Sequence, residues 1–157
     1  MKKTDAFEWA MAGLQKMLPA ESIEKKPNSI RYSADTRIRN LGHEVTEVYR
    51  IDTGMSFPNQ RYGISIQLIK QGDRVFLQKD FGMSIVAYEF HPENKNWSDE
   101  KKKLFAELVE YHDVAVDLET WIVSVEVKYH EHICNHFCRF YSNLMAFLLV
   151  LPWLEDL

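Results

Sequence analysis

The C-terminal half of the chain has almost no glycine or proline. No glycine follows Gly82, and no proline lies between Pro92 and Pro152. Helix interiors disfavour glycine because of its conformational freedom, and proline because it lacks an N–H group and its ring clashes with the preceding turn. Their absence predicts a helical region over residues 98–151.

The chain also lacks a strong net charge, a long apolar run and a cysteine framework. Its formal net charge of −4 argues against a nucleic-acid partner, because nucleic-acid binding usually needs a concentrated basic surface. The longest apolar run, residues 144–151, is too short to span a bilayer. The two cysteines lie four positions apart, and acidic residues interrupt any signal sequence near the start of the chain. We therefore expect a reducing compartment and a cytoplasmic protein.

Short catalytic motifs are missing as well. The sequence contains no glycine-rich phosphate loop, no G-x-S-x-G nucleophile elbow and no C-x-x-C pair. These absences do not decide whether the chain is an enzyme, but they favour a protein without catalytic activity. The sequence offers no residue that we would assign as catalytic.

The residues that are present predict one α+β domain over residues 1–157. Hydrophobic residues make up 46% of the chain and aromatic residues 13%, which is typical of a packed globule. Apolar residues at helical spacing predict an N-terminal helix within residues 1–18, capped by Thr4 and ended by Pro19. A polar connector is expected over residues 19–28.

The middle of the chain, residues 29–91, changes to a period of two. Alternating apolar residues predict four or five short strands, arranged as an antiparallel meander with one buried face. The clearest runs lie at residues 30–34, 45–51, 62–68 and 86–90. Turns are expected between them at residues 40–42, 52–54, 71–73 and 80–82.

Apolar residues then recur at steps of three or four from Leu104 to Leu151, with Ser98 as a helix N-cap. One straight helix over this region would be about 80 Å long, twice the diameter of a compact domain of this size. We therefore expect two or three helices packed on one face of the sheet. The favoured break lies at residues 112–117, and a weaker one at residues 142–143. Residues 123–129 alternate like a strand, but helix is favoured because flanking turn residues are missing.

A cluster of soft ligands lies inside this region, between His130 and Cys138. On a helix, His130, Cys134 and Cys138 share one side at spacing i, i+4, i+8, and a zinc ion is the cofactor they would hold. A structural zinc site needs four ligands, so His43, His91 or His112 would have to supply the rest from elsewhere in the chain. On a strand, the same residues would all face one side of the sheet. The favoured interpretation is structural, with half-buried residues flanking an apolar stripe and no cofactor bound.

Aromatic residues supply the candidate partner surfaces. Trp153 and Leu154 end an apolar C-terminal run, which either closes the core or contacts a partner or a second copy of the chain. Tyr49 and Tyr62 lie on the expected strands, with Arg50 close by in sequence. We expect these tyrosines to contact a protein through the exposed sheet face; a single-stranded nucleic acid is the less favoured ligand.

The sequence therefore favours a non-enzymatic protein-binding module, such as an inhibitor, an immunity-type protein or an adaptor. Small size, mild acidity and aromatic content support this hypothesis. The first alternative is a metal-binding protein or metalloenzyme that uses residues 130–138. The second is a carrier with an apolar pocket between sheet and helices, and homodimerisation is compatible with all three.

Overall fold

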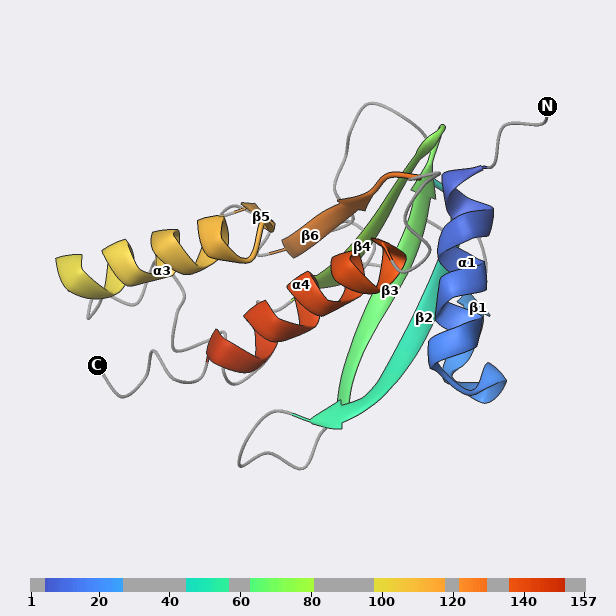
Figure 1. Ribbon diagram of the computed structural model, residues 1–157, viewed down its shortest axis with the longest axis horizontal. Helices are drawn as coiled ribbons and strands as arrows, with labels where there is room; N and C mark the ends of the chain where they lie inside the picture. The colour runs from blue at the N-terminus through green and yellow to red at the C-terminus, as the bar shows by residue number, and fades with distance from the viewer. Residues whose placement is uncertain are drawn as a thin grey trace.

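A computed structural model describes residues 5–26, 45–56, 63–80, 98–117, 122–129 and 136–151. These residues form three α-helices and a six-stranded antiparallel sheet (Figure 1), which confirms the α+β class and adds strands to the expected four or five. The elements in chain order are α1 (Ala6–Met17), a 3-10 turn (Ala20–Ser22), β1 (Ile23–Lys26), β2 (Val45–Ser56), β3 (Gly63–Gln71), β4 (Arg74–Asp80), α3 (Asp99–Tyr111), β5 (Ala115–Asp117), β6 (Ile122–Val127) and α4 (His136–Val150). None of these helices is long and apolar enough to cross a membrane.

The sheet has the strand order β1-β2-β3-β4-β6-β5, and every neighbouring pair is antiparallel. The first four strands are consecutive along the chain, and the turn between β3 and β4 is tight because Gly72 adopts a φ of 60°. This turn agrees with the sequence prediction for residues 71–73. The meander expected in the middle of the chain is therefore present over β2, β3 and β4.

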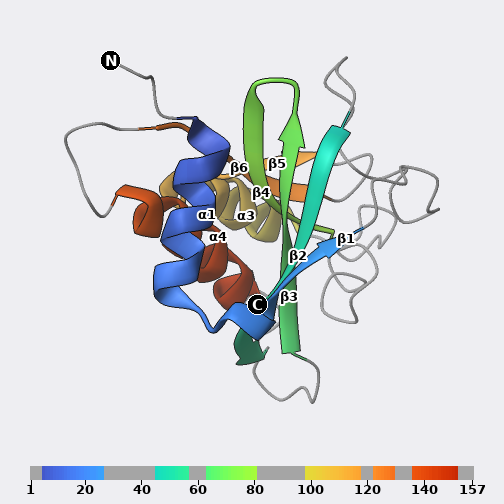
Figure 2. The same ribbon diagram turned by 90° about the vertical axis from the view of Figure 1, so that its right-hand side faces the viewer.

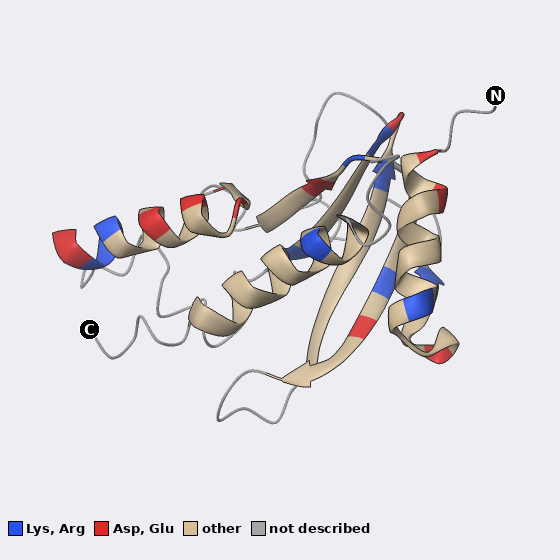
Figure 3. Cartoon of the chain, in the orientation of Figure 1, with Lys and Arg blue, Asp and Glu red and all other residues tan. Residues whose placement is uncertain are grey.

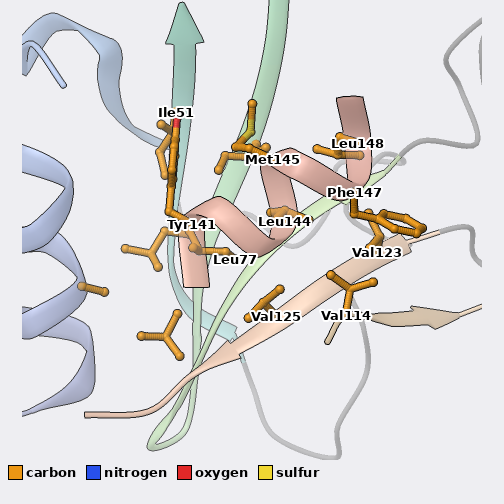
Figure 4. Packing of buried hydrophobic residues seen from close by; sticks show 14 of the residues in the cluster. Ile51, Leu77, Val114, Val123, Val125, Tyr141, Leu144, Met145, Phe147 and Leu148 are labelled. Atoms are coloured by element: carbon orange, nitrogen blue, oxygen red, sulfur yellow. The ribbon is translucent and has the colours of Figure 1, made fainter. Parts of the chain in front are cut away.

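Helices α1 and α4 cover one face of the sheet, as the edge-on view in Figure 2 shows. Alternate residues of the strands point into this layer, where they meet the apolar side of both helices (Figure 4). Leu14 of α1, Leu77 of β4 and Leu144 of α4 each have no exposed surface. The main hydrophobic core of the described residues lies in this layer.

Helix α1 begins one residue later than the sequence indicated. Its N-cap is Asp5, not Thr4, and the Asp5 carboxylate accepts a hydrogen bond of 2.7 Å from the backbone N–H of Phe7. Gly13 permits close packing against α4, because a Cβ atom at this position would lie 2.3 Å from the Phe137 ring. The helix is thus fixed both by its cap and by its contact with α4.

Helix α3 begins as predicted, with the Ser98 hydroxyl accepting a hydrogen bond of 3.1 Å from Lys101 N–H. It ends at the predicted break in a Schellman motif: Asp113 N–H donates to Glu110 C=O and Val114 N–H to Val109 C=O. Asp113 holds the left-handed position with a φ of 53°. Figure 1 shows α3 extending away from the sheet beyond β5, so the prediction that all C-terminal helices pack on the sheet face was wrong for α3.

The predicted helical region over residues 98–151 contains two strands that the sequence did not predict, one inside the expected break and one where helix was favoured. Residues 115–117 form β5, and residues 122–127 form β6, which pairs with both β4 and β5. Ile122, Val123 and Val125 are all buried, so β6 has apolar residues on both faces and its spacing also fits a helix. The weaker break at residues 142–143 is also wrong, because both positions lie inside α4.

Two further expectations need correction in the N-terminal half. The connector over residues 19–28 contains β1, which pairs with β2 from Ile23 opposite Ile51. The turn expected at residues 52–54 is an irregularity within β2, where the register with β3 shifts between Asp52 and Ser56. The runs predicted at residues 30–34 and 86–90 lie outside the described residues, as does the turn at residues 40–42.

Candidate functional site

Cys138 is the one member of the proposed zinc set within the described residues, since His130 and Cys134 lie outside them. It sits in the first turn of α4, where its thiol donates to the Met17 sulfur of α1 at 3.6 Å. Both side chains are half-buried. The structure therefore brings two soft sulfur atoms together between α1 and α4, and the Met17 partner had not been anticipated from the sequence.

The described residues contain no group of three histidine, cysteine, aspartate or glutamate side chains that could hold a metal ion. His112, a candidate for a distant zinc ligand, is buried at the end of α3 with Nδ1 2.8 Å from the Leu108 carbonyl oxygen. Its ring packs edge-on against Phe147, with centroids 5.9 Å apart. These contacts give His112 a packing role in joining α3 to α4.

The predicted partner-binding residues fall into two groups. Trp153, Leu154 and Tyr62 lie outside the described residues, so their role stays a prediction. Tyr49 lies on the helix-covered face of the sheet, half-buried, with its ring centroid 5.6 Å from that of Phe7. Arg50, the next residue in β2, points to the opposite face. Tyr49 and Arg50 therefore do not share the basic aromatic surface that a single-stranded nucleic acid would need.

The opposite face of the sheet carries a small second core and a polar row. Val48 and Ile69 pack together there, and Gln67, Gln78 and Ser124 occupy facing positions on β3, β4 and β6. Gln78 and Ser124 are each 2% exposed, and Gln78 Nε2 donates to Gln67 Oε1 over a long 3.4 Å. The centre of this face is therefore buried, whereas Arg50 on β2 is exposed, and contact with a partner through the sheet face stays a prediction.

One ion pair on this face is joined by two hydrogen bonds. The Arg74 guanidinium forms two hydrogen bonds to the Glu126 carboxylate, at 2.9 and 2.8 Å, and lies 5.0 Å above the Phe76 ring. The hydrogen bond to Glu126 raises the pKa of the Arg74 side chain above its usual value. Because the pair joins β4 to β6, a structural role accounts for it and it is no candidate binding site.

Tyr111, by contrast, is a large aromatic side chain that the fold leaves open. It lies in the last turn of α3 and is 83% exposed, compared with 42% for Met55, the other large hydrophobic residue exposed among those described. Its ring meets the His112 ring edge-on, with centroids 5.0 Å apart. Through His112 and then Phe147, Tyr111 is connected to the buried core. The exposed ring is therefore supported by packed aromatic neighbours.

The surface around Tyr111 is acidic. Glu107, Glu110 and Asp113 are all exposed, and no lysine or arginine occurs between Leu104 and Val114. In Figure 3 the half of α3 next to β5 carries red bands and no blue ones, whereas the blue bands lie towards the start of the helix, beside further red ones. The ion pairs found between described residues do not include any of these three carboxylates. Together with Tyr111, these residues form what we call the α3 surface.

Sequence reasoning did not single out Tyr111. Its spacing from Leu104 and Leu108 places it on the stripe of apolar residues that was expected to be buried. A signal was nevertheless present, because the stripe through Leu104 and Leu108 reaches Tyr111 at the turn where carboxylates surround it. An aromatic residue in such a charged setting is a better candidate for a surface contact than for a core position.

Comparisons with known proteins do not identify a family for this chain. The chain matches no family model, no curated protein and no solved structure. Its function must therefore be argued from its own residues.

Proposed function

We propose that the chain is a non-enzymatic protein-binding module, of the kind represented by inhibitors, immunity-type proteins and adaptors. The exposed and supported ring of Tyr111 is the observation that carries this proposal. Tyrosine is enriched at the energetic centres of protein interfaces, because its ring buries a large area at a low cost in side-chain entropy.

A carrier of an apolar ligand is less well supported. Its pocket was expected between sheet and helices, where Leu144 and Phe147 of α4 have no exposed surface and fill the layer. Binding a ligand there would require these side chains to move. A protein partner needs no such rearrangement.

The size of the native assembly tests the protein-binding proposal. The free chain has a mass of 18.5 kDa. In extracts of cells that make it, we expect the chain to elute with a second protein in a complex that re-forms at fixed stoichiometry from the two purified components. Elution of the whole pool at the mass of the free chain, or at twice that mass, would contradict the proposal; the second result would indicate a homodimer.

A metal-binding function is retained as the second candidate because of one contact. Cys138 and Met17 place a thiol and a thioether 3.6 Å apart, and such sulfur ligands select soft metal ions. Elemental analysis of the purified protein provides the test. Zinc, copper or iron below about 0.1 equivalent would end this candidate, since a built site retains its ion through purification.

A further inference from the structure

The α3 surface has a chemistry that specifies its partner. We infer that it docks onto a positively charged segment of another protein, with the Tyr111 ring as the anchor. This inference rests on the proposed protein-binding function and names the partner class for one surface. Its support comes from the position of the ring, the carboxylates near it, which form no ion pair with another described residue, and the backbone at Asp113.

The position of the ring defines where the partner contacts α3. Leu104, Leu108 and Tyr111 follow one another at spacing i, i+4, i+7, so they lie along one side of the helix. Leu104 and Leu108 are half-buried at the margin of the core, whereas Tyr111 is 83% exposed. The stripe thus leads from the core to an open aromatic ring. A partner seated here covers the Tyr111 ring and extends the existing apolar contact.

The carboxylates define the sign of the partner's charge. Glu107 lies one turn before Tyr111, Glu110 directly precedes it and Asp113 follows in the turn, so three exposed negative charges lie within four residues of one aromatic anchor. They do not belong to a group of described ligands that could hold a metal ion. Their field attracts lysine and arginine and repels phosphate, which argues against nucleic acid and anionic lipid. A basic protein segment is the complementary occupant.

The backbone at Asp113 supports the same conclusion. This residue adopts a φ of 53° at a position where glycine is usual, because a side chain destabilises the left-handed conformation. The hydrogen bonds that Asp113 and Val114 make in the turn are backbone bonds, from Asp113 N–H to Glu110 C=O and from Val114 N–H to Val109 C=O. Glycine would therefore make the same turn without strain and without charge. Aspartate adds a third carboxylate to the surface at some cost in stability.

Site-specific photocrosslinking in cells that make the protein tests the inference. A photoreactive benzophenone amino acid replaces Tyr111 in one variant and Ala106 in a control. Ala106 is also exposed on α3 but lies about 140° away around the helix. We expect the Tyr111 position, and not Ala106, to form a covalent adduct with one partner protein. The crosslinked segment of that partner should carry several lysine or arginine residues.

Charge reversal and ring variants then measure the contribution of each group in the purified complex. Tyr111→Ala should weaken binding by about 30-fold or more, the loss typical of an interface hot spot, while Tyr111→Phe should retain most of the affinity. The double variant Glu107→Lys/Glu110→Lys should slow association and remove its dependence on salt. Unchanged affinity in Tyr111→Ala, or unchanged salt dependence in the charge-reversed variant, would overturn the inference.

The crosslinking result also separates this inference from the function on which it rests. Two further variants carry the benzophenone residue at Met55 and at Trp153; an adduct from either of them but not from the Tyr111 variant would leave the protein-binding function in place and overturn the α3 surface. An adduct at Tyr111 with an acidic segment, or with a second copy of the chain, would overturn the assignment of a basic partner. Absence of adducts at all these positions, together with elution of the free chain alone, would overturn both proposals.

Discussion

Helices α3 and α4 have similar lengths but very different relations to the rest of the molecule. The 15-residue α4 contains one charged residue, Arg139, and packs across the sheet. The 13-residue α3 contains seven charged residues, and Phe105 is its single buried residue. α4 is thus specified by the core, while α3 is attached along one side by aromatic contacts and half-buried aliphatic residues and exposes most of its other residues. A helix attached in this way can contact a binding partner through its exposed residues.

The largest predicted effect tests the packed side of this comparison. Leu144→Ala should lower the free energy of unfolding by about 2–5 kcal/mol, because Leu144 has no exposed surface and truncation leaves a cavity. Leu108→Ala on α3 is the matched control and should cost less than half as much, since Leu108 is half-buried. Urea denaturation measures both. Equal losses would mean that α3 is as much a part of the core as α4.

A second substitution tests the contact between α1 and α4. Gly13→Ala should destabilise the protein by about 1–3 kcal/mol, because its new Cβ atom would lie 2.3 Å from Phe137 Cδ1 and force the ring or the helix to shift. Helix propensity alone predicts the opposite sign, a gain of about 1 kcal/mol. Thermal and urea unfolding decide between them. Ala12→Gly, at an exposed position of the same helix, calibrates the propensity effect.

A third substitution tests the strain at the end of α3. Asp113→Gly should raise the free energy of unfolding by about 1 kcal/mol, because glycine adopts a φ of 53° without a steric penalty. The α3 amides should also exchange more slowly with solvent. A loss of stability would show that the Asp113 side chain stabilises the fold, which would remove its assignment to the α3 surface.

Titration of Tyr141 should produce a smaller effect, confined to alkaline pH. Burial raises the pKa of this α4 phenol above its usual value near 10, so the unfolded chain releases the proton first as the pH rises. Stability associated with the neutral phenol is therefore complete below about pH 10 and is lost as the pH passes through the raised pKa of the folded state. Tyr141→Phe should lessen this loss in urea titrations between pH 8 and pH 11. Identical pH profiles would contradict the assignment.

The sequence predicted those elements whose periodicity depends on one buried side. Helix α1, the alternating strands β2 and β3 and the end of α3 all follow from it. Strand β6 was missed because it is buried on both faces, so Ile122, Val125 and Tyr129 also fit a helical spacing. Strand β1 was missed for the opposite reason: as a four-residue edge strand that ends in two lysines, it resembles a polar connector.

The candidate site was harder to predict than the fold, because it depends on a residue of the apolar stripe that is exposed, whereas such residues are usually buried. Sequence periodicity assigns Tyr111 to the buried stripe. Only the tertiary structure shows that the apolar stripe of α3 continues past the buried core at this end of the helix, so that Tyr111 is exposed. The contact between Cys138 and Met17 likewise joins residues far apart in sequence. Periodicity reports which side of an element is apolar, but it does not report how far the neighbouring element extends.

The central claim is that the α3 surface is used for binding and not for folding. Tyr111→Ala tests it when the free energy of unfolding and the affinity for the partner are measured on the same preparation. We predict a change in stability within about 0.5 kcal/mol, as for an exposed side chain, together with an affinity loss of about 30-fold or more. A stability loss of about 2 kcal/mol or more with unchanged affinity would show that Tyr111 serves the fold instead, and would contradict the account.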